Sequence, residues 1–311
     1  MAGDCAELRD LVLEAGALEP LLANVQQPAS LSLLRNTVWS LSNCCRGKPT
    51  VSNDVASKVI PLVSSIILQC SDEDTLIDAI WAFSYLTDAA NDRIDMILQQ
   101  KDVVVSLVKH LKSRSSTLVA PALRVLGNIV TGDDEQTQAV MDAGILPQLL
   151  PLLQHPKKSL RKETCWLISN IAAGNRKQIS ALLNEPRLIA EVLQHLAWGQ
   201  WEVREEAAWA ISNLCMSKEH VQAVVQIGAI RPLCELLTAS DPSLVVVVLN
   251  AIENILLVSE ENGLDYDERL EDADGLDKLE ELQGHKNEEI YLKAVGILER
   301  YFPGEEDLGE D

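Results

Sequence analysis

Two segments of the chain combine a carboxylate, an indole and an amide at the same spacing. The first reads Glu163-Thr-Cys-Trp-Leu-Ile-Ser-Asn170, and the second, forty-three residues later, reads Glu206-Ala-Ala-Trp-Ala-Ile-Ser-Asn213. On a helix, residues three and four positions apart lie on one face, with Cβ atoms about 5–6 Å apart. An indole face attracts a cation by about 0.5–2 kcal/mol, and an amide can hydrogen-bond to a peptide backbone. Each stripe could therefore bind part of a cationic, extended ligand.

Weaker copies of the stripe occur on both sides of these two. They are the pairs Trp39/Asn43, Trp81/Tyr85, Arg124/Asn128 and Asn250/Asn254. The first members of all six pairs follow one another at steps of 42, 43, 42, 43 and 41 residues. A constant period in this range is typical of an array in which each repeat buries its apolar faces against its neighbours. A ladder of packing tryptophans is the alternative, since a single tryptophan on an apolar helix is usually core. Polar amides in register favour the binding stripe.

Each period predicts three helices, with the stripe on the third and longest. In residues 134–173 we expect helices over 135–142, 145–154 and 159–172, with Ser159 as an N-cap and Gly174 as the C-terminal stop. The same glycine break after the first helix occurs at Gly16, three periods before Gly144, and at Gly228, two periods after it. Three helices with this break indicate armadillo rather than two-helix HEAT repeats. The predicted fold is all-α, an armadillo-repeat right-handed superhelical solenoid.

The predicted array covers residues 1–303, and an acidic disordered tail covers 304–311. Between the last two repeats, the acidic and aperiodic residues 259–267 are expected to form a mobile loop. Trp198 and Trp201 lie off the repeat phase and are interpreted as packing residues, although Trp201 could be exposed. The expected repeat bounds are 4–47, 50–88, 91–131, 134–173, 175–215, 217–258 and 268–303.

The composition restricts the classes of function. The 311 residues carry a net charge of −21, of which −14 falls in the last 53 residues, and this acidity argues against nucleic acid and for basic partners. Seven scattered cysteines and five unpaired histidines show no metal-binding or catalytic spacing, so we expect no metal, no cofactor and no enzyme activity. No apolar run is long enough for a membrane span and no signal peptide is evident.

Several segments resemble the importin-alpha (karyopherin-alpha) family of nuclear-import adaptors over essentially the whole chain. The segments are Trp39-Ser-Leu-Ser-Asn-Cys-Cys-Arg-Gly-Lys48, Trp81-Ala-Phe-Ser-Tyr-Leu-Thr-Asp88, Leu126-Gly-Asn-Ile-Val-Thr-Gly-Asp-Asp-Glu-Gln-Thr137, Trp209-Ala-Ile-Ser-Asn213 and Gly275-Leu-Asp-Lys-Leu-Glu280. By this resemblance the repeats correspond to the family's fourth to tenth. The family's basic importin-beta-binding segment and first three repeats do not precede Met1, which suggests an excised fragment or a truncated gene product. Importin-beta is thus an expected partner only if that segment were present.

The resemblance also implies two peptide sites. The minor site is expected to be intact, with Val130, Gly132 and Thr137 resembling the pocket for a key lysine. Of the major site only an edge and a linker region are expected. Arg124 either repels ligand cations and divides the groove or pairs with a carboxylate on a neighbouring helix. The minor-site residues are Asn128, Val130, Gly132, Thr137, Glu163, Trp166, Ser169, Asn170, Glu206, Trp209 and Asn213, and those of the major-site edge and linker are Trp39, Asn43, Asp78, Trp81 and Tyr85.

The expected function is an adaptor of the cytoplasm and nucleus that binds basic nuclear localisation signals in an extended conformation. By resemblance, the last repeats should contribute to binding the export receptor and a nucleoporin. An armadillo scaffold of the junction or cytoskeletal type, binding other extended peptides, is the alternative, and a regulator of an enzyme is a third reading. The predicted stripe carries three acidic residues, Asp78, Glu163 and Glu206, and one basic residue, Arg124. This negative charge favours the adaptor, which binds basic peptides, over the scaffold.

Overall fold

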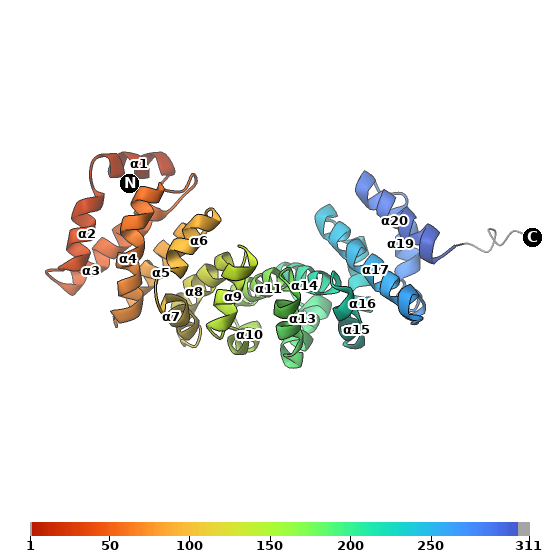
Figure 1. Cartoon of the computed structure of the whole chain (residues 1–311). Helices are drawn as coiled ribbons and strands as arrows, with labels where there is room; N and C mark the ends of the chain where they lie inside the picture. Colours follow the sequence, from red (N-terminus) through yellow and green to blue (C-terminus); the bar gives the residue numbers. More distant parts are fainter. Residues whose placement is uncertain (1, 304–311) are drawn as a thin grey trace, which may run out of the picture. The chain divides into compact units, whose positions relative to one another are not determined.

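The computed structural model describes residues 2–303, and the predicted tail at 304–311 lies outside them. The described chain consists of twenty α-helices and one short 3-10 helix, and no strand occurs within it (Figure 1). The all-α armadillo prediction is therefore confirmed. The chain divides into two compact units, and the boundary in the sequence falls between Leu152 and Leu153. We call the described parts of them the N-terminal unit (2–152) and the C-terminal unit (153–303).

In the N-terminal unit the longest helices of successive repeats pack against one another. Helix α3 contacts α5, and α5 contacts α8, while α2, α4 and α7 each pack on the long helix that follows them. The helices of this unit are α1 (Ala6–Glu14), α2 (Leu18–Gln26), α3 (Leu31–Cys45), α4 (Asn53–Gln69), α5 (Glu73–Thr87), α6 (Asn91–Leu98), α7 (Val103–His110), α8 (Ser116–Ile129), α9 (Asp134–Asp142) and α10 (Leu146–Leu153), the last of which ends at the boundary.

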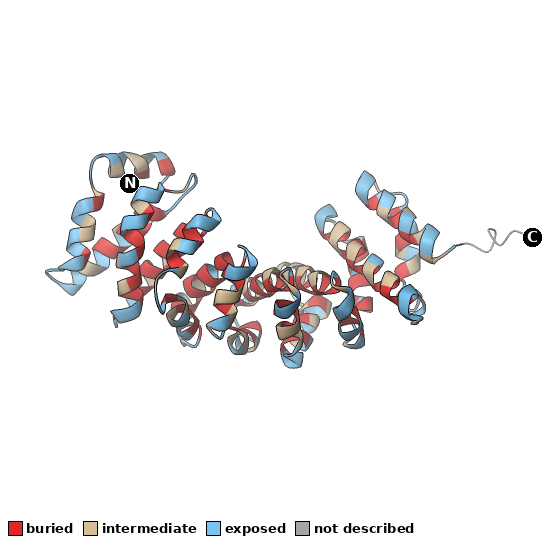
Figure 2. Cartoon of the chain, in the orientation of Figure 1, coloured by how far each residue is buried: buried red, intermediate tan, exposed pale blue. Residues whose placement is uncertain are grey.

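The C-terminal unit is built in the same way. Helix α11 packs against α14, α14 against α17, and α17 against α20. Their inward faces are fully buried, as Leu167, Ile168 and Ile171 of α11 show with 0% exposure, and Figure 2 shows buried residues along each long helix. The helices are α11 (Lys158–Ala172), α12 (Arg176–Leu183), α13 (Pro186–Trp198), α14 (Trp201–Cys215), α15 (Lys218–Gln226), α16 (Ile230–Glu235), the 3-10 helix η1 (Leu236–Thr238), α17 (Pro242–Asn262), α18 (Tyr266–Glu271), α19 (Gly275–Leu282) and α20 (Glu288–Tyr301).

The predicted glycine break depends on a left-handed backbone conformation. Gly16, Gly144 and Gly228 have φ values of +82°, +82° and +95° between the first and second helices of their repeats. Glycine adopts this conformation without a steric penalty. Asp102, forty-two residues before Gly144, takes the same role with φ +62°. Aspartate is among the few other residues that visit this region.

The second repeat departs from the predicted three helices. Forty-two residues before Asp102 stands Ile60, a β-branched residue for which positive φ is strongly unfavourable. The break is absent there, and α4 runs as one helix of 17 residues from Asn53 to Gln69 with Pro61 inside it. The expectation of three helices in every repeat is therefore wrong for this one.

Two other local predictions are corrected. Helix α11 begins at Lys158 and its N-cap is Lys157, which makes no side-chain capping bond, so Ser159 is not the cap. The predicted mobile loop at 259–267 is mostly helical, because α17 continues to Asn262 and α18 starts at Tyr266. The buried Ser259 joins the two helices: its Oγ donates to the carbonyl oxygen of Leu264 at 2.8 Å and accepts from the Tyr266 N–H at 3.0 Å.

Helix α17 is long and apolar enough, by length and composition alone, to cross a membrane. The lengths of the uninterrupted apolar runs did not predict such a helix, because Asn250 and Glu253 interrupt its apolar residues. Over half of its most apolar window is buried inside the protein, and it packs against α14, α15 and α20. These contacts are those of a core helix.

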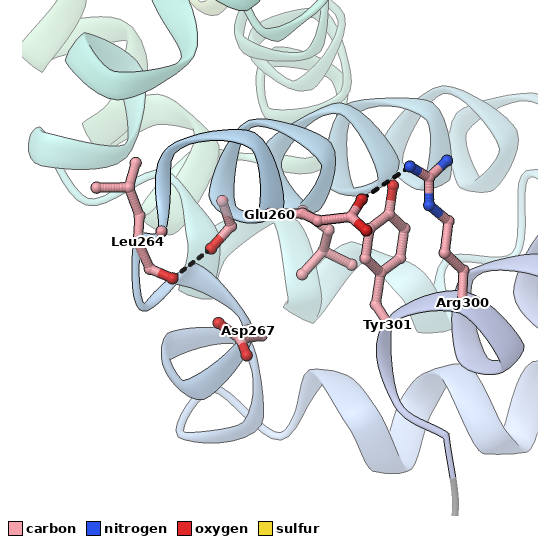
Figure 3. A pocket seen from close by; sticks show the side chains of 8 residues that line it. Glu260, Leu264, Asp267, Arg300 and Tyr301 are labelled. Atoms are coloured by element: carbon pink, nitrogen blue, oxygen red, sulfur yellow. Dashed lines mark hydrogen bonds and ion pairs between the residues drawn. The ribbon is translucent and has the colours of Figure 1, made fainter. Parts of the chain in front are cut away.

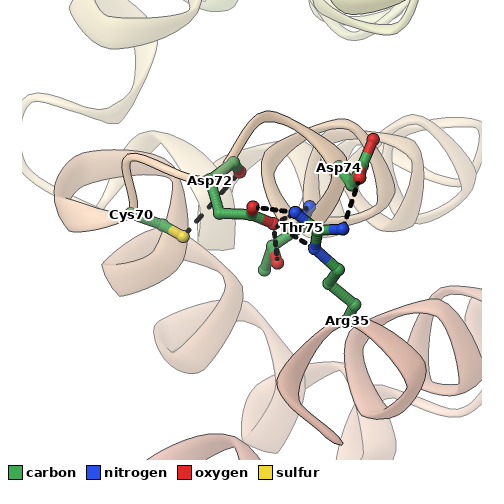
Figure 4. A network of polar contacts seen from close by, with 5 residues as sticks. All are labelled: Arg35, Cys70, Asp72, Asp74 and Thr75. Carbon is green, nitrogen blue, oxygen red and sulfur yellow. Dashed lines mark hydrogen bonds and ion pairs between the residues drawn. The ribbon is translucent and has the colours of Figure 1, made fainter. Parts of the chain in front are cut away.

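Polar contacts between neighbouring repeats add to the packing. Arg35 of α3 reaches the start of α5, where its Nε donates to Asp72 Oδ2 at 3.0 Å and its Nη1 lies 2.9 Å from Asp74 Oδ2 (Figure 4). Asp72 is also the N-cap of α5 and accepts from the Thr75 N–H at 3.0 Å. The hydrogen bonds from Arg35 and then Thr75 hold the pKa of the Asp72 carboxyl well below its usual range.

The interpretation of Trp198 as a packing residue is wrong, whereas Trp201 is exposed, which is the alternative stated for it. Trp198 ends α13 and Trp201 begins α14, and their side chains are 87% and 44% exposed.

Candidate functional site

The two complete stripes lie on adjacent, packed helices of the C-terminal unit. Glu163, Trp166 and Asn170 are on α11, and the second set is on α14. The carboxylates, indoles and amides of both sets are half-buried, whereas the flanking residues of each helix are core. One side of each indole therefore packs against protein while part of it remains accessible. This is the arrangement that the forty-three-residue repeat predicted within this unit.

One amide of the stripe links the two helices, and the other bonds to the backbone of its own helix. Asn213 Nδ2 donates to the carbonyl oxygen of Ser169 at 2.9 Å, joining α14 to α11. Asn170 Nδ2 donates to the carbonyl oxygen of Trp166 at 2.9 Å, and the buried Ser169 hydroxyl donates to the same oxygen at 2.8 Å. An amide has two N–H groups and one acceptor oxygen. Each of these asparagines thus keeps an N–H and the oxygen for a ligand backbone after these bonds.

A lysine lies beside the second carboxylate. Lys162 Nζ on α11 is 3.8 Å from Glu206 Oε1 on α14. The expectation that only Arg124 opposes the acids of the stripe is therefore wrong. Lys162 stands four residues before Trp166, so it lies on the same face of the helix. It was not predicted as part of the site, because the stripe was defined by its acid, indole and amide alone.

In the N-terminal unit the predicted linker already holds a cation of the protein itself. The rings of Trp81 and Tyr85 on α5 stack with centroids 6.0 Å apart and an interplanar angle of 23°. The guanidinium carbon of Arg46, the C-cap of α3, lies 5.9 Å from the Tyr85 ring centroid. Arg46 was not among the residues predicted for the site, because it follows the end of α3 and no periodic pattern places it over the ring.

Trp39 is the most exposed of the tryptophans in phase, at 57%. Asn43 Nδ2 donates to the carbonyl oxygen of Trp39 at 3.0 Å, as Asn170 does in its own repeat. Asp78 on α5 is half-buried, and this burial, together with the charge of Asp74, raises the pKa of its carboxyl. Asp78 is therefore more easily neutralised than an exposed aspartate. Arg124 on α8 is exposed.

Asn128 of the minor site and the residues assigned to the lysine pocket are mostly buried within the N-terminal unit. Asn128 is 6% exposed, and its Nδ2 donates to the carbonyl oxygen of Ser84 and to the Thr87 hydroxyl, both at 3.0 Å. Val130 and Thr137 are 2% and 3% exposed, and the Thr137 hydroxyl donates to the Val130 carbonyl oxygen at 3.4 Å. Gly132 is half-buried. These residues hold α5, α8 and α9 together, and a direct role for them in binding stays a prediction.

Each unit has a hollow beside residues of the predicted binding stripes. One of ≈ 400 Å³ lies beside Asn213, with Met216 in its wall, and one of ≈ 420 Å³ adjoins Trp39 and Asn43. A third, of ≈ 250 Å³, lies away from the stripes between α17 and α20, where Glu260 Oε2 and Arg300 Nη2 are 2.8 Å apart (Figure 3). Within residues 2–303 no cluster of three or more metal-ligating side chains occurs.

The cysteines form no disulfide, and most are inert. Burial raises the pKa of the Cys45, Cys215 and Cys234 thiols to about 12. A thiol with such a pKa is almost entirely protonated at neutral pH and is a poor nucleophile.

Comparisons with known proteins agree with the repeat pattern. The armadillo/beta-catenin-like repeat model matches residues 5–46, 133–173 and 217–257, and the atypical Arm repeat model matches 264–311. Importin subunit alpha-1b of Oryza sativa is 46% identical over 99% of this chain. Importin subunit alpha-8 of Arabidopsis thaliana is 33% identical over 96% of the chain, which covers 68% of that protein.

The chain belongs to the importin subunit alpha family. These importin alpha subunits are armadillo adaptors rather than enzymes. The chain spans 59% of the length of the Oryza alpha-1b subunit and 56% of that of Arabidopsis thaliana alpha-4, to which it is 47% identical over 94% of its own residues.

Solved structures share the fold. An engineered protein superposes with a TM-score of 0.83 at 24% identity, covering 96% of this chain and 71% of that one. A designed armadillo repeat protein in complex with the peptide (KR)4 superposes with a TM-score of 0.68 at 29% identity, covering 78% of this chain and 98% of that one.

Proposed function

We propose that this chain is a nuclear-import adaptor that binds basic nuclear localisation signals of cargo proteins in an extended conformation. The observation that carries the proposal is the pair of half-buried acid, indole and amide sets on α11 and α14, which pack together and are joined by the bond from Asn213 to Ser169. Membership of the importin alpha family supports it, as does the likeness to a designed armadillo protein that binds a Lys-Arg peptide.

The stripe would recognise such a ligand through three kinds of contact. The accessible parts of Trp166 and Trp209 would flank the methylene stem of a lysine or arginine and attract its cation. Glu163 and Glu206 would favour a cation over a neutral side chain, with Glu206 exchanging Lys162 for the ligand. Packed helices lie about 8–10 Å apart, and an extended peptide advances about 3.3 Å per residue. One repeat would then accommodate about three ligand residues.

Residues of the N-terminal unit would bind basic ligands as well. Asn128, Val130, Gly132 and Thr137 would contact ligand residues within that unit. Trp39 and Asn43 would form a secondary contact. Arg46 lies over Tyr85 and would compete with a ligand cation at the Trp81–Tyr85 stack.

Further partners follow from the family. The C-terminal repeats would contribute to binding an export receptor and a nucleoporin, and importin-beta would bind only a chain that carries the basic N-terminal segment. The adaptor would work in both cytoplasm and nucleus, without nucleic acid or membrane as a ligand. The junction-type scaffold loses its support, because the relatives found are importin alpha subunits.

A titration tests the proposal. A fluorescent peptide of alternating lysine and arginine should bind with an anisotropy change, and the same peptide with alanine at its lysines should bind far more weakly. Binding should weaken as salt is added, because the contact is partly electrostatic. Equal binding of the two peptides, or no binding of either, would refute the proposed function.

A further inference from the structure

The most exposed large apolar side chain in residues 2–303 is Trp198, with 87% of its surface accessible. Trp201 lies three residues later and is 44% exposed. The two indoles flank the turn Gly199-Gln200 between α13 and α14, outside the phase of the stripe tryptophans. Tryptophan is costly to leave in water and is enriched at the energetic centres of protein interfaces.

The turn that carries the two indoles is held by several hydrogen bonds. The Gly199 N–H donates to the carbonyl oxygen of His195 at 2.9 Å, and a Cβ at position 199 would lie 2.3 Å from that oxygen. Arg204 Nε donates to the carbonyl oxygen of Leu196 at 2.8 Å, and Arg161 Nη2 donates to Gln200 Oε1 at 3.3 Å. Trp198 and Trp201 are therefore presented on a fixed backbone, which lowers the entropic cost of binding a partner.

Positive charge lies beside this turn in an otherwise acidic protein. Arg161 contacts Gln200, and Lys158 Nζ is 2.6 Å from Glu202 Oε1, so the start of α11 adjoins the start of α14. Lys157 is exposed and makes no ion pair within the part of the chain that the structure describes. Neither α11 nor α14 has a side-chain cap at its N-terminus. Their uncapped first N–H groups add partial positive charge on the same side.

We propose that the Trp198–Trp201 turn, with Lys157 and Lys158, docks a short acidic segment of a partner protein that also carries apolar side chains. The apolar side chains would cover the indoles, and the carboxylates would pair with Lys157 and with the uncapped N–H groups. This ligand is opposite in charge to the basic signal proposed for the stripe.

A short acidic protein segment fits this surface better than a nucleic acid or an anionic membrane does. Lys158 is paired with Glu202, and Glu205 lies one turn further along α14, so the cations are too few and too compensated to bind a run of phosphates. The net charge of −21 would repel nucleic acid or an anionic membrane from the rest of the chain. A short acidic peptide needs only the local charge.

Differential peptide selection tests the proposal. A display library of random peptides of about twelve residues, or about 40 Å when extended, would be selected on the whole wild-type chain and on Trp198→Ser/Trp201→Ser. Trp198 is 87% and Trp201 44% exposed, so the double variant should remain folded, as circular dichroism would verify, and should keep its binding of a Lys-Arg peptide. Sequences enriched only on the wild type should combine acidic and apolar residues. A synthetic peptide of that sequence should bind the double variant at least tenfold more weakly and Lys157→Glu several-fold more weakly.

Several results would overturn the proposal. They are enrichment that the double variant retains, wild-type-specific sequences without acidic residues, or no sequence that distinguishes the two chains. Parallel titrations with a single-stranded RNA oligonucleotide and with vesicles of phosphatidylserine should show no binding that depends on the two tryptophans, and such binding would contradict the assignment to a protein partner.

Discussion

Replacement of Trp166 or Trp209 by alanine should weaken binding of a basic peptide about thirtyfold. Part of each ring is accessible, and we take about half of the stem of a bound lysine or arginine to lie against it. Exposing half of a stem of three to four methylenes costs about 1.2–1.6 kcal/mol at about 0.8 kcal/mol for each. Loss of the cation–π contact adds about 0.5–1 kcal/mol. The sum, about 2 kcal/mol, corresponds to the thirtyfold change.

Isothermal titration calorimetry with one Lys-Arg peptide would measure this change. Trp198→Ala is the matched control, because it removes an exposed indole of the same unit that lies off the stripe, and its affinity should equal that of the wild type. Trp39→Ala should reduce affinity by less than about threefold, since this indole is 57% exposed and the neighbouring Tyr85 ring already carries Arg46. Circular dichroism of each variant would verify that it is folded.

The reasoning fails if Trp39→Ala is more damaging than Trp166→Ala and Trp209→Ala. It also fails if Trp198→Ala weakens the basic peptide as strongly as they do, because then the loss would not report on the stripe.

Three further changes test other parts of the structure. In a chain that already carries Trp166→Ala, the added change Arg46→Ala should strengthen binding of a basic peptide several-fold, because the Tyr85 ring loses its internal cation. A fluorescence titration would measure the affinity, and an unchanged affinity would argue against the contact between Arg46 and Tyr85. Ser259→Ala should lower the free energy of unfolding by about 1–3 kcal/mol, because the buried Tyr266 N–H loses its acceptor. In the wild type, residues 259–266 should exchange their amide hydrogens slowly. Exchange as fast as in an unstructured loop would support the mobile loop that the sequence predicted. Asp72→Asn should lower the melting temperature at pH 7 by about 1–3 °C, because asparagine can still cap α5 but has no charge to pair with Arg35. The pKa of Asp72 is lower in the folded than in the unfolded chain, so the stabilisation of the fold by this carboxylate is complete above the unfolded pKa of about 3.9 and is lost as pH falls below it. The melting temperatures of the wild type and Asp72→Asn should therefore converge at low pH. A difference between them that is unchanged at pH 2 would refute the ion-pair account.

The repeat pattern predicted the long third helices and the stripe on them well. Trp166 and Trp209 recur with their acids and amides at fixed spacing, and only a helix places all three on one face. The glycine breaks were also readable, because Gly16, Gly144 and Gly228 mark a backbone conformation that few residues adopt. The fused helix α4 could have been predicted from the same logic, since Ile60 occupies the glycine position.

Contacts between repeats could not be predicted in this way. The bonds of Asn213 to Ser169 and of Lys162 to Glu206 depend on how two helices are rotated against each other, which the sequence period leaves open. Arg46 and Ser259 act from helix ends, where no periodicity places a side chain. The exposure of Trp198 and Trp201 conflicts with the usual burial of tryptophan, and only the path of the turn reveals it.

A crystal structure of this chain with a bound Lys-Arg peptide tests the central claim most directly. The account predicts an extended peptide across α11 and α14, with a lysine or arginine stem between Trp166 and Trp209 and its backbone bonded to Asn170 and Asn213. A peptide bound only at Trp39 and Tyr85, or away from both stripes, would contradict it.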